Sequence, residues 1–474
     1  MFQKLVTLQA FFLFDMNSSR SETNRYSVLA VVCLSASLVP FTGSSINLAL
    51  PRISEELSLN AVALGWIVTA FLLASAILQI PFGRAGDMFG RKKVLAAGVL
   101  LFSLASMACA AAPSGNLLIA ARFVQGIAAA MLFGVNMAIV TSVFPANERG
   151  KALGINTAVI YFAIAAGPFL GGMLTHYWGW RSIFVTTAGL GLLALTGVFI
   201  VLKDEWIDAK GERYDWCGSL IYAIGLFAII YGCSMLPSVT GFCLVAAGVA
   251  AFILFVCYEK KQSAPVFNMN MFLANRVFRM SSFAALINYA ATFAIGFMLS
   301  LYLQYIKGFD AQKAGLVLVI QPVMQTIISP LAGKWSDKMN ASNIASLGMA
   351  IIVACLLSML FLTPDSSLIM LIAILVVLGT GFALFSSPNV NVIMGSVEKR
   401  FLGMASATTG TMRLTGQSIS MGITMMMISV FVGKTQITAD VYPLFMKCLH
   451  YTFGIFVVLC VLGVYTSMVR NNRK

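Results

Sequence analysis

The stretch GRAGDMFGRKK (residues 83–93) places one acid and four bases directly after Val62–Pro81, a run that contains no charge. A run of about 20 apolar residues can cross roughly 30 Å of hydrocarbon as a helix, at about 1.5 Å per residue. Comparable uncharged runs recur along the whole chain. The stretch therefore predicts a membrane-spanning helix that ends in a short charged connection, and the pattern repeats.

The composition points to the same class of protein. The chain has 474 residues, of which 59% are hydrophobic and only 10% are charged, so it holds more apolar side chain than a soluble domain could cover. Backbone groups in lipid must bond to one another, which leaves helices or a closed barrel. These runs lack the strict alternation of a barrel. We therefore expect an all-α membrane protein.

Charge and cysteine usage exclude several other functions. The formal net charge of +14 is distributed over the connections between apolar runs, which indicates membrane topology and no nucleic-acid partner. The nine cysteines never form a CxxC pair, so we expect no metal site and no cofactor. Nothing resembles a Walker P-loop, so ATP-driven transport has no support. We expect a protein that is not an enzyme.

Breaks in hydropathy predict fourteen spans. If the N-terminus is cytoplasmic, most of the 31 Lys and Arg residues fall in cytoplasmic segments and two fall inside spans. The opposite orientation would reverse this bias, so we expect a multi-pass protein of the cytoplasmic membrane with both termini inside. The predicted spans are 26–50, 62–82, 94–112, 117–143, 150–176, 182–202, 216–236, 240–258, 278–305, 312–333, 342–362, 367–394, 402–432 and 445–469.

The sequence also contains an internal repeat. PFGRAGD (81–87) is echoed by PLAGKWSD (330–337), and NERGKA around Glu148 by EKRFLGMA from Glu398, both at an offset of 250 residues. Two matches at one offset predict two six-helix halves with two inserted helices between them. The predicted division is a cytoplasmic segment 1–25, an N-terminal bundle 26–202, a linker with two spans 203–277, a C-terminal bundle 278–470 and a cytoplasmic tail 471–474.

Two parallel halves are an arrangement used for alternating access, with the substrate near mid-membrane between them. A repeated bundle of this kind is also compatible with a channel or a passive scaffold.

Three motifs together resemble those of the major facilitator superfamily, and within it the fourteen-helix drug:proton antiporter branch. They are GRAGDMFGRKK, ARFVQGIAAA in the fourth span and AIAAGPFLGGML in the fifth. The matching residues are Gly83, Asp87, Gly90, Arg91 and Lys92 in the first motif, Arg122, Gln125 and Gly126 in the second, and Gly167, Pro168, Gly171 and Gly172 in the third.

The resemblance implies the major facilitator fold, with two pseudo-symmetric six-helix bundles plus two inserted helices. It also implies a monomer that exports amphipathic small molecules in exchange for protons, in contact with membrane lipid. Two departures bear on that mechanism. Ala163 replaces the first glycine of the third motif, and Thr42 stands where this branch commonly has an acid in the first span.

Ionisable groups are scarce inside the predicted spans. All 17 acids fall in connections or at helix ends, and His176 and His450 lie near the outer ends of their spans. Buried ionisable residues in membranes are costly and usually functional. Proton coupling must therefore use Asp87 or another group at the rim. Arg122 and Arg413 remain inside the spans. For Arg122, hydrogen bonding to carbonyls and a functional role are equal alternatives. For Arg413 we favour a structural role.

Polar and aromatic residues within apolar spans are the candidates for a substrate cavity, although the aromatic ones are also ordinary core residues. The candidates are Asn47, Asn136, Tyr161, Asn288, Gln321, Gln325, Asn389, Arg413 and Gln417. In the fifth span, Pro168 and its neighbouring glycines allow either bending at a gate or tight helix packing.

Asp87 is the predicted centre of a conformational latch formed by Gly83, Asp87, Gly90, Arg91, Lys92 and the equivalent Asp337. We expect the carboxylate to accept bonds from a helix N-terminus or from Arg91, and so to fasten the two halves when the protein faces outward. The leading function is a proton-coupled secondary exporter. The alternatives are an organic-anion exporter or uniporter and, in another class, a receptor or scaffold that transports nothing.

Overall fold

The computed structural model describes residues 25–469 apart from 146–147, 213, 237, 263–265, 268, 398–401 and 434. Its regular structure is helical, and the described residues contain no strand. Within the described residues, fourteen helical spans are long and apolar enough to cross a membrane, so the predicted number of spans and the all-α class are confirmed.

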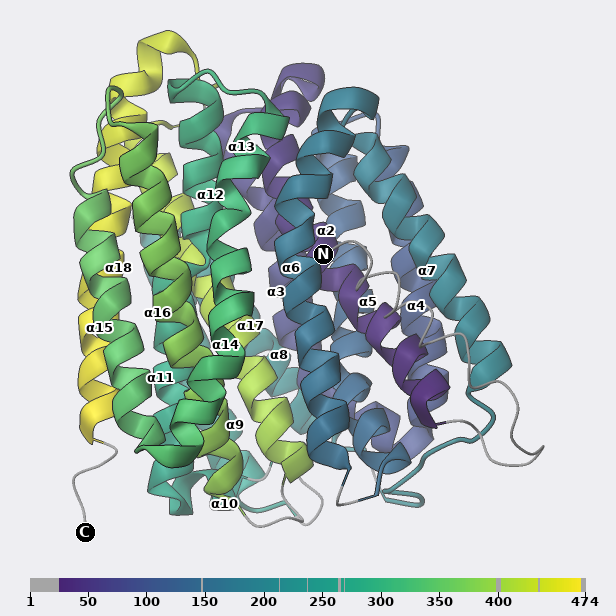
Figure 1. Cartoon of the computed structure of the whole chain (residues 1–474). Coiled ribbons are helices and arrows are strands. Elements are labelled where there is room, and N and C mark those ends of the chain that lie inside the picture. Colours follow the sequence, from purple (N-terminus) through teal and green to yellow (C-terminus); the bar gives the residue numbers. More distant parts are fainter. Residues whose placement is uncertain are drawn as a thin grey trace.

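The first six spans form one bundle, on the right of Figure 1, in which α3 packs on α5, α2 on α6 and α4 on α7. The helices are α2 (Arg25–Leu57), α3 (Ala61–Phe89), α4 (Arg91–Ala110), α5 (Gly115–Val143), α6 (Arg149–Trp178) and α7 (Arg181–Val201).

The last six spans form the second bundle, on the left of Figure 1, in which α15 packs on α16, α14 on α16 and α11 on α17 and α18. Short α10 (Met269–Ala274) precedes it. The spans are α11 (Arg276–Thr292) with α12 (Ala294–Leu301) and the π-helical η1 (Tyr302–Ile306), α13 (Ala311–Leu318) with α14 (Ile320–Lys338), α15 (Ala341–Met359), α16 (Leu368–Gly395), α17 (Leu402–Phe431), and the 3₁₀ turn η3 (Ala439–Val441) with α18 (Tyr442–Val469).

The inserted pair consists of α8 (Trp216–Met235) and α9 (Val239–Glu259), which pack mainly on each other. The α8 helix also contacts α3 of the first bundle and α17 of the second. The inserted helices therefore lie at the junction of the two bundles.

Equivalent contacts recur in the two bundles. The Asn136 side chain on α5 donates from Nδ2 to the carbonyl of Val32 on α2, at 3.0 Å. Asn389 on α16 donates from Nδ2 to the carbonyl of Ser281 on α11, at 3.2 Å. Both pairs join corresponding helices about one repeat apart, so the internal repeat in the sequence is also a repeat in contacts.

The charged stretch 83–93 differs from the predicted connection. It is helical except at Gly90, where α3 ends and α4 begins at once. Gly90 has a φ of +117°, a backbone conformation that glycine adopts without steric cost. We call the end of the molecule that carries this junction the basic face and the other end the opposite face.

Several described contacts join the bundles toward the opposite face. A Cβ at Gly172 on α6 would lie 2.5 Å from the carbonyl oxygen of Ala311, at the start of α13. Ser300 donates to the carbonyl of Asn47, at 2.6 Å, across the bundles. The backbone N–H of Ala61 donates to Thr435, at 3.0 Å. These contacts hold the bundles together near that face.

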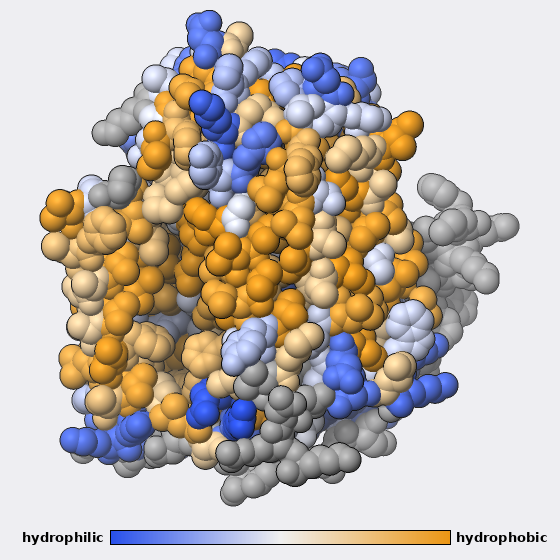
Figure 2. All heavy atoms as spheres, turned by 90° about the vertical axis from the view of Figure 1, so that its left-hand side faces the viewer, coloured by the Kyte–Doolittle hydropathy of each residue, from blue (hydrophilic) through white to orange (hydrophobic). Residues whose placement is uncertain are grey.

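The outer surface of the second bundle carries a broad apolar belt between two polar ends, as Figure 2 shows. Exposed apolar residues of α15 and α18 include Leu347, Leu357, Val461, Leu462 and Tyr465. A continuous apolar belt of this kind fits contact with lipid tails.

Candidate functional site

The glycines of the first motif let helices approach closely. A Cβ at Gly86 would lie 2.4 Å from Val135 Cγ1 on α5, and a Cβ at Gly134 would lie 2.8 Å from the backbone nitrogen of Gly83. A Cβ at Gly90 would lie 2.5 Å from the Glu205 carboxyl carbon. Gly83 and Gly86 thus belong to the α3–α5 crossing, whereas Gly90 makes the sharp turn into α4.

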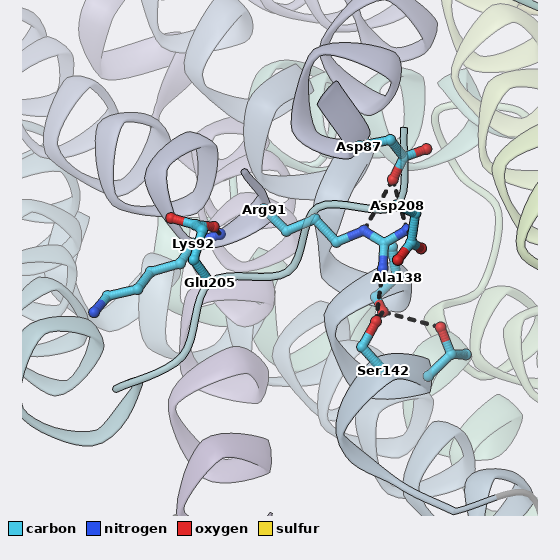
Figure 3. Close-up of polar contacts among 8 residues, drawn as sticks. Asp87, Arg91, Lys92, Ala138, Ser142, Glu205 and Asp208 are labelled. Carbon is cyan, nitrogen blue, oxygen red and sulfur yellow. Dashed lines mark hydrogen bonds and ion pairs between the residues drawn. The ribbon is translucent and has the colours of Figure 1, made fainter. Parts of the chain in front are cut away.

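Arg91 is the centre of a polar cluster on the basic face (Figure 3). Its guanidinium donates to Asp87 Oδ1 from Nε at 2.9 Å and from Nη2 at 2.6 Å. It also donates to Ser142 Oγ on α5, at 2.6 Å, and pairs with Asp208. The Arg91 side chain is 8% exposed, against 66% for Asp208. The motif therefore fixes a buried guanidinium between α3, α4 and α5.

The segment after α7 closes this cluster from the side. The backbone N–H of Lys92 donates to Glu205 Oε1, at 2.8 Å, while the Lys92 side chain points away from the cluster in Figure 3. The backbone N–H of Ala209 donates to the Asp87 carbonyl, at 3.0 Å. The described partners of Asp87 thus belong to the first bundle and to residues 203–212.

The equivalent position in the second bundle is Asp337, which falls within α14, but its side chain lies outside the described residues. The fastening of the two bundles through Asp87 and Asp337 accordingly stays a prediction.

Arg122 lies inside the first bundle and is 0% exposed. It donates to the Ile67 carbonyl on α3, at 3.1 Å, and to Gln125 Oε1, at 2.5 Å. The guanidinium also lies 4.3 Å from the centroid of the Phe71 ring. A Cβ at Gly126 would lie 2.3 Å from the Phe71 carbonyl oxygen. The second motif therefore joins α3 to α5 through one buried arginine and one close glycine contact.

Arg413 lies in a different setting, between the bundles. It comes from α17 and its guanidinium lies 5.0 Å from the centroid of the Phe133 ring on α5 of the other bundle. Tyr289 on α11 lies near both Arg413 and Tyr161, the latter on α6. Arginine over an aromatic face is attracted to the ring without needing an acid.

Gln79 extends this group of residues along α3. It is 5% exposed, its Oε1 has no donor among the described residues, and a Cβ at Gly410 on α17 would lie 2.6 Å from its Nε2. We call Gln79, Phe133, Tyr161, Tyr289 and Arg413 the central seam. It combines polar and aromatic side chains from both bundles and contains no carboxylate.

The third motif contacts both neighbouring helices. A Cβ at Gly171 would lie 2.5 Å from Ser45 Cβ on α2, and Ser45 Oγ donates to the Gly167 carbonyl, at 3.0 Å. On the other side, a Cβ at Gly315 of α13 would lie 2.3 Å from the carbonyl oxygen of Pro168. The motif thus packs α6 between its own bundle and the other one; bending at Pro168 stays a prediction.

Thr42 occupies the place of the expected acid in the first span. Its Oγ1 donates to the Leu38 carbonyl, at 2.8 Å, and lies 3.1 Å from Thr187 Oγ1 on α7. Two neutral hydroxyl groups therefore replace a carboxylate at this position.

The remaining cavity candidates divide into side chains with a hydrogen-bond partner and side chains without one among the described residues. Gln321 donates to Gln325 Oε1 on the same helix, at 3.2 Å. Asn47 Oδ1 and both amide atoms of Asn288 are buried without a hydrogen-bond partner among the described residues. Gln417 is half-buried on α17. Buried amides normally have partners, so Asn47 and Asn288 are the candidates most available to a ligand or water.

Sequence reasoning overlooked several polar partners. Asn156 on α6 donates to Asn136 Oδ1, at 2.7 Å, which makes Asn136 part of a network inside the first bundle. Glu205 and Asp208 complete the cluster around Arg91. The signal for these two was the acidic segment KDEWIDAKGERYD (203–215), which follows a span that ends on the same face as the basic stretch.

Comparison with known proteins yields one family and a consistent fold. A sequence model of the Major Facilitator Superfamily matches residues 32–421 and 281–471 of the chain. Riboflavin transporter RibZ of Clostridioides difficile (strain 630) is 30% identical over 82% of this chain and 85% of its own length. Multidrug resistance protein Stp of Mycobacterium tuberculosis (strain ATCC 25618 / H37Rv) is 30% identical over 82% of this chain and 73% of its own.

More distant relatives are similar over most of their length. The tetracenomycin C resistance and export protein of Streptomyces glaucescens is 25% identical over 88% of this chain and 77% of its own. Among solved structures, a bacterial homologue of the human lysosomal transporter Spinster, inward-facing and unoccupied, superposes with a TM-score of 0.70 at 17% identity, covering 95% of this chain and 98% of that chain. At this identity the likeness shows the fold alone.

Proposed function

Because the chain belongs to the major facilitator superfamily, we propose that it exports amphipathic small molecules across the cytoplasmic membrane by alternating access, driven by proton entry. Family and fold make the chain a multi-pass membrane transporter of small molecules rather than an enzyme. In the proposal it acts as a monomer whose basic face, with both termini, is cytoplasmic, as the distribution of Lys and Arg favours.

The observation that carries the proposal is the central seam. Arg413 and Phe133 come from different bundles and meet inside the membrane-spanning region. Gln79 and Gly410 likewise come from different bundles and contact each other. Transporters with two related halves bind substrate near mid-membrane at the interface of the halves. Aromatic walls with a few polar groups are also the usual lining of small-molecule sites.

Contacts near the opposite face support alternating access as the transport mechanism. Gly172 packs on Ala311 and Ser300 donates to Asn47, both between bundles. A transporter that exports must break such contacts to release its substrate outward. The basic-face cluster around Arg91 joins the first bundle to residues 203–212 instead, so the two faces use different groups to control opening.

Export as the direction of transport rests on the names of several relatives. Stp is named a multidrug resistance protein, and the Streptomyces glaucescens protein is named for tetracenomycin C resistance and export. RibZ is named a riboflavin transporter. Substrates of the present chain therefore include aromatic, amphipathic compounds in our proposal, without a commitment to drugs alone.

Proton coupling requires a titratable group that changes its surroundings between states. Thr42 and Thr187 occupy the position of the first-span acid, so that position carries no proton. We assign the coupling to a carboxylate at the rim, with Asp87 as the leading candidate because α3 connects it to the seam residue Gln79.

A second candidate function, export of organic anions, is favoured by Arg413. This cation lies at the seam, and no Asp or Glu occurs in the central part of any span. A cationic substrate would meet repulsion there, whereas a carboxylate or phenolate would be attracted.

The test uses purified protein in liposomes that enclose a pH-sensitive dye, with the vesicle interior made acidic. Ethidium, riboflavin and fluorescein serve as cationic, neutral and anionic probes. Proton-coupled export predicts accumulation of at least one probe together with a rise of internal pH, absent from protein-free vesicles. Accumulation of fluorescein without any pH change supports the anion exporter or uniporter instead. No movement of any probe by a well-folded protein favours the receptor or scaffold and contradicts the proposal.

A further inference from the structure

Two carboxyl groups meet at the basic end of the inserted helices, outside both bundles. Asp215 is the N-cap of α8: its Oδ1 accepts from the backbone N–H of Gly218, at 2.8 Å, and from the Tyr258 hydroxyl, at 3.2 Å. Glu259 is the last residue of α9 and is 1% exposed. Its Oε2 accepts from the backbone N–H of Phe267, at 3.4 Å. One oxygen of each carboxyl group is thus bonded.

The other two oxygens lie on either side of one small space and have no donor among the described residues. Asp215 Oδ2 and Glu259 Oε1 are both buried and have no hydrogen-bond partner among the described residues. A Cβ at Gly218 would lie 2.5 Å from Asp215 Oδ2 and 2.6 Å from Glu259 Oε1. Both oxygens therefore border the same small space, which is open because residue 218 has no side chain.

This arrangement is unfavourable for two negative charges. Like charges in close contact and shielded from water cannot both ionise without a large cost. A single proton removes the repulsion and supplies the missing O–H···O bond between the two groups. We propose that Asp215 and Glu259 form a proton-binding site that holds one shared proton at neutral pH on the basic side of the inserted pair.

The neighbouring charges compensate the two carboxyl groups only in part. Arg84 on α3 pairs with Glu212 of the preceding segment, and its charge also acts on Glu259, but its Nε has no partner among the described residues. Lys260 and Lys261 follow Glu259 in the chain but are exposed to solvent. On the helices themselves, the facing groups are Tyr258 and Cys217, which interact with each other and with Asp215. None of these described groups donates to the two facing oxygens.

Residues that neighbour Asp215 in the chain are hydrogen-bonded to α3. The Tyr214 hydroxyl donates to the Pro81 carbonyl, at 3.1 Å, and accepts from Ser219 Oγ, at 3.2 Å. Burial, together with the charge of Asp215, raises the pKa of the Tyr214 hydroxyl, so it remains a donor at neutral pH. Tyr222 on α8 donates to the Ala76 carbonyl, also on α3, at 3.1 Å.

Loss of the shared proton would leave two negative charges beside Gly218 and drive α8 and α9 apart at the basic face. Because α8 is bonded to α3, and α3 carries Asp87 in its last turn, this site senses the pH at the basic face and biases the helix end that carries the Asp87 cluster. The site lies away from the central seam, so it regulates and does not carry the proton that drives export. The inference thus goes beyond the proposed function and does not depend on its substrate.

Infrared difference spectroscopy of the purified full-length protein tests the site directly. A protonated carboxyl group gives a C=O stretching band that a carboxylate lacks. We expect such a band at neutral pH and its loss in Glu259→Gln and in Asp215→Asn, because either change removes one of the two carboxyl groups. Glu212→Gln, which alters the exposed partner of Arg84, is the matched control and should leave the band in place. A spectrum without a protonated-carboxyl band at neutral pH, or a band that survives both substitutions, overturns the proposal.

A stability measurement provides an independent readout. The folded protein holds a proton that the unfolded chain releases, so folding should become less stable as pH rises through the titration of the pair. We expect the thermal midpoint of the wild type to fall over that range and that of Glu259→Gln to fall less, because its amide stays neutral and can donate to Asp215. Equal pH dependence in both proteins contradicts a shared proton.

Discussion

Arg122 and Arg413 lie in the interior of their spans, away from the helix ends, and their surroundings differ. Arg122 is enclosed by α3, α4 and α5, where a carbonyl, an amide and an aromatic ring surround its guanidinium. Arg413 is half-buried between the bundles and contacts the Phe133 ring of the opposite one. Two guanidinium nitrogens of Arg122 donate inside its own bundle, and Nη2 has no partner among the described residues. We therefore expect Arg122 to serve mainly the structure of that bundle, whereas Arg413 at the seam can respond to a ligand.

We expect the largest effect on folding from substitution of Arg122, and this effect distinguishes the two arginines. Arg122→Ala leaves the Ile67 carbonyl and Gln125 without their donor, and each unsatisfied buried group costs about 1–3 kcal/mol. We expect a sharp drop in the yield of folded protein and in its thermal midpoint, measured by size-exclusion chromatography and thermal unfolding. Arg122→Lys, which keeps the charge, should recover part of both. A stable Arg122→Ala protein would break the comparison, because Arg122 would then not be structural.

A smaller effect is expected at the Arg91 cluster, which is largely buried and which we propose to act as a conformational latch. Asp87→Asn removes the charge from the bonds to Arg91, and bonds to charged groups contribute about 1.5–3 kcal/mol each. We expect transport to fall by about tenfold while membrane insertion and the amount of folded protein stay near wild type.

The exposed partner Asp208 supplies the control for this change. Asp208→Asn should alter transport much less, since an ion pair to a largely exposed carboxylate contributes little. Normal transport by a well-folded Asp87→Asn protein would refute the latch and leave Asp87 with only a structural role.

The smallest effect is expected where α6 meets the second bundle. A methyl group at Gly172 would press on the Ala311 carbonyl, 2.5 Å away, and overpacking of this kind costs about 1–3 kcal/mol. Gly172→Ala should weaken the closed state at the opposite face and lower transport roughly twofold to fivefold. Gly154→Ala on the same helix is the control, because no atom lies within 4 Å of its Cβ position. Equal transport by both variants would show that the contact between Gly172 and Ala311 is not part of the gate.

The sequence was sufficient for the number and order of the spans, because the length of an apolar run is a local property. The repeat was equally visible, since Asp337 and Glu398 follow Asp87 and Glu148 at one offset. The helix ends were less predictable. The α3 helix continues through the charged stretch to Phe89, since Asp87 and Arg91 satisfy each other and only Gly90 has to leave helical geometry.

The direction of polar side chains was not predictable, because it depends on helix rotation and on distant partners. Asn136 and Asn389 are cavity candidates from sequence, yet each donates to a carbonyl of its own bundle. Glu205 reaches the N-terminus of α4 across more than a hundred residues of chain. Asp215 and Glu259 meet because α8 and α9 pack antiparallel and Gly218 leaves room. Spacing in the sequence gives no sign of such meetings.

The central claim is that substrate passes between the bundles beside Arg413. It is tested most directly by transport of ethidium, riboflavin and fluorescein in liposomes containing Arg413→Gln, with Arg413→Lys as the charge-preserving control. We predict an unchanged thermal midpoint and a change of about tenfold or more in transport of at least one probe, reversed in part by the lysine. Wild-type rates for all three probes by a folded Arg413→Gln protein would contradict the account.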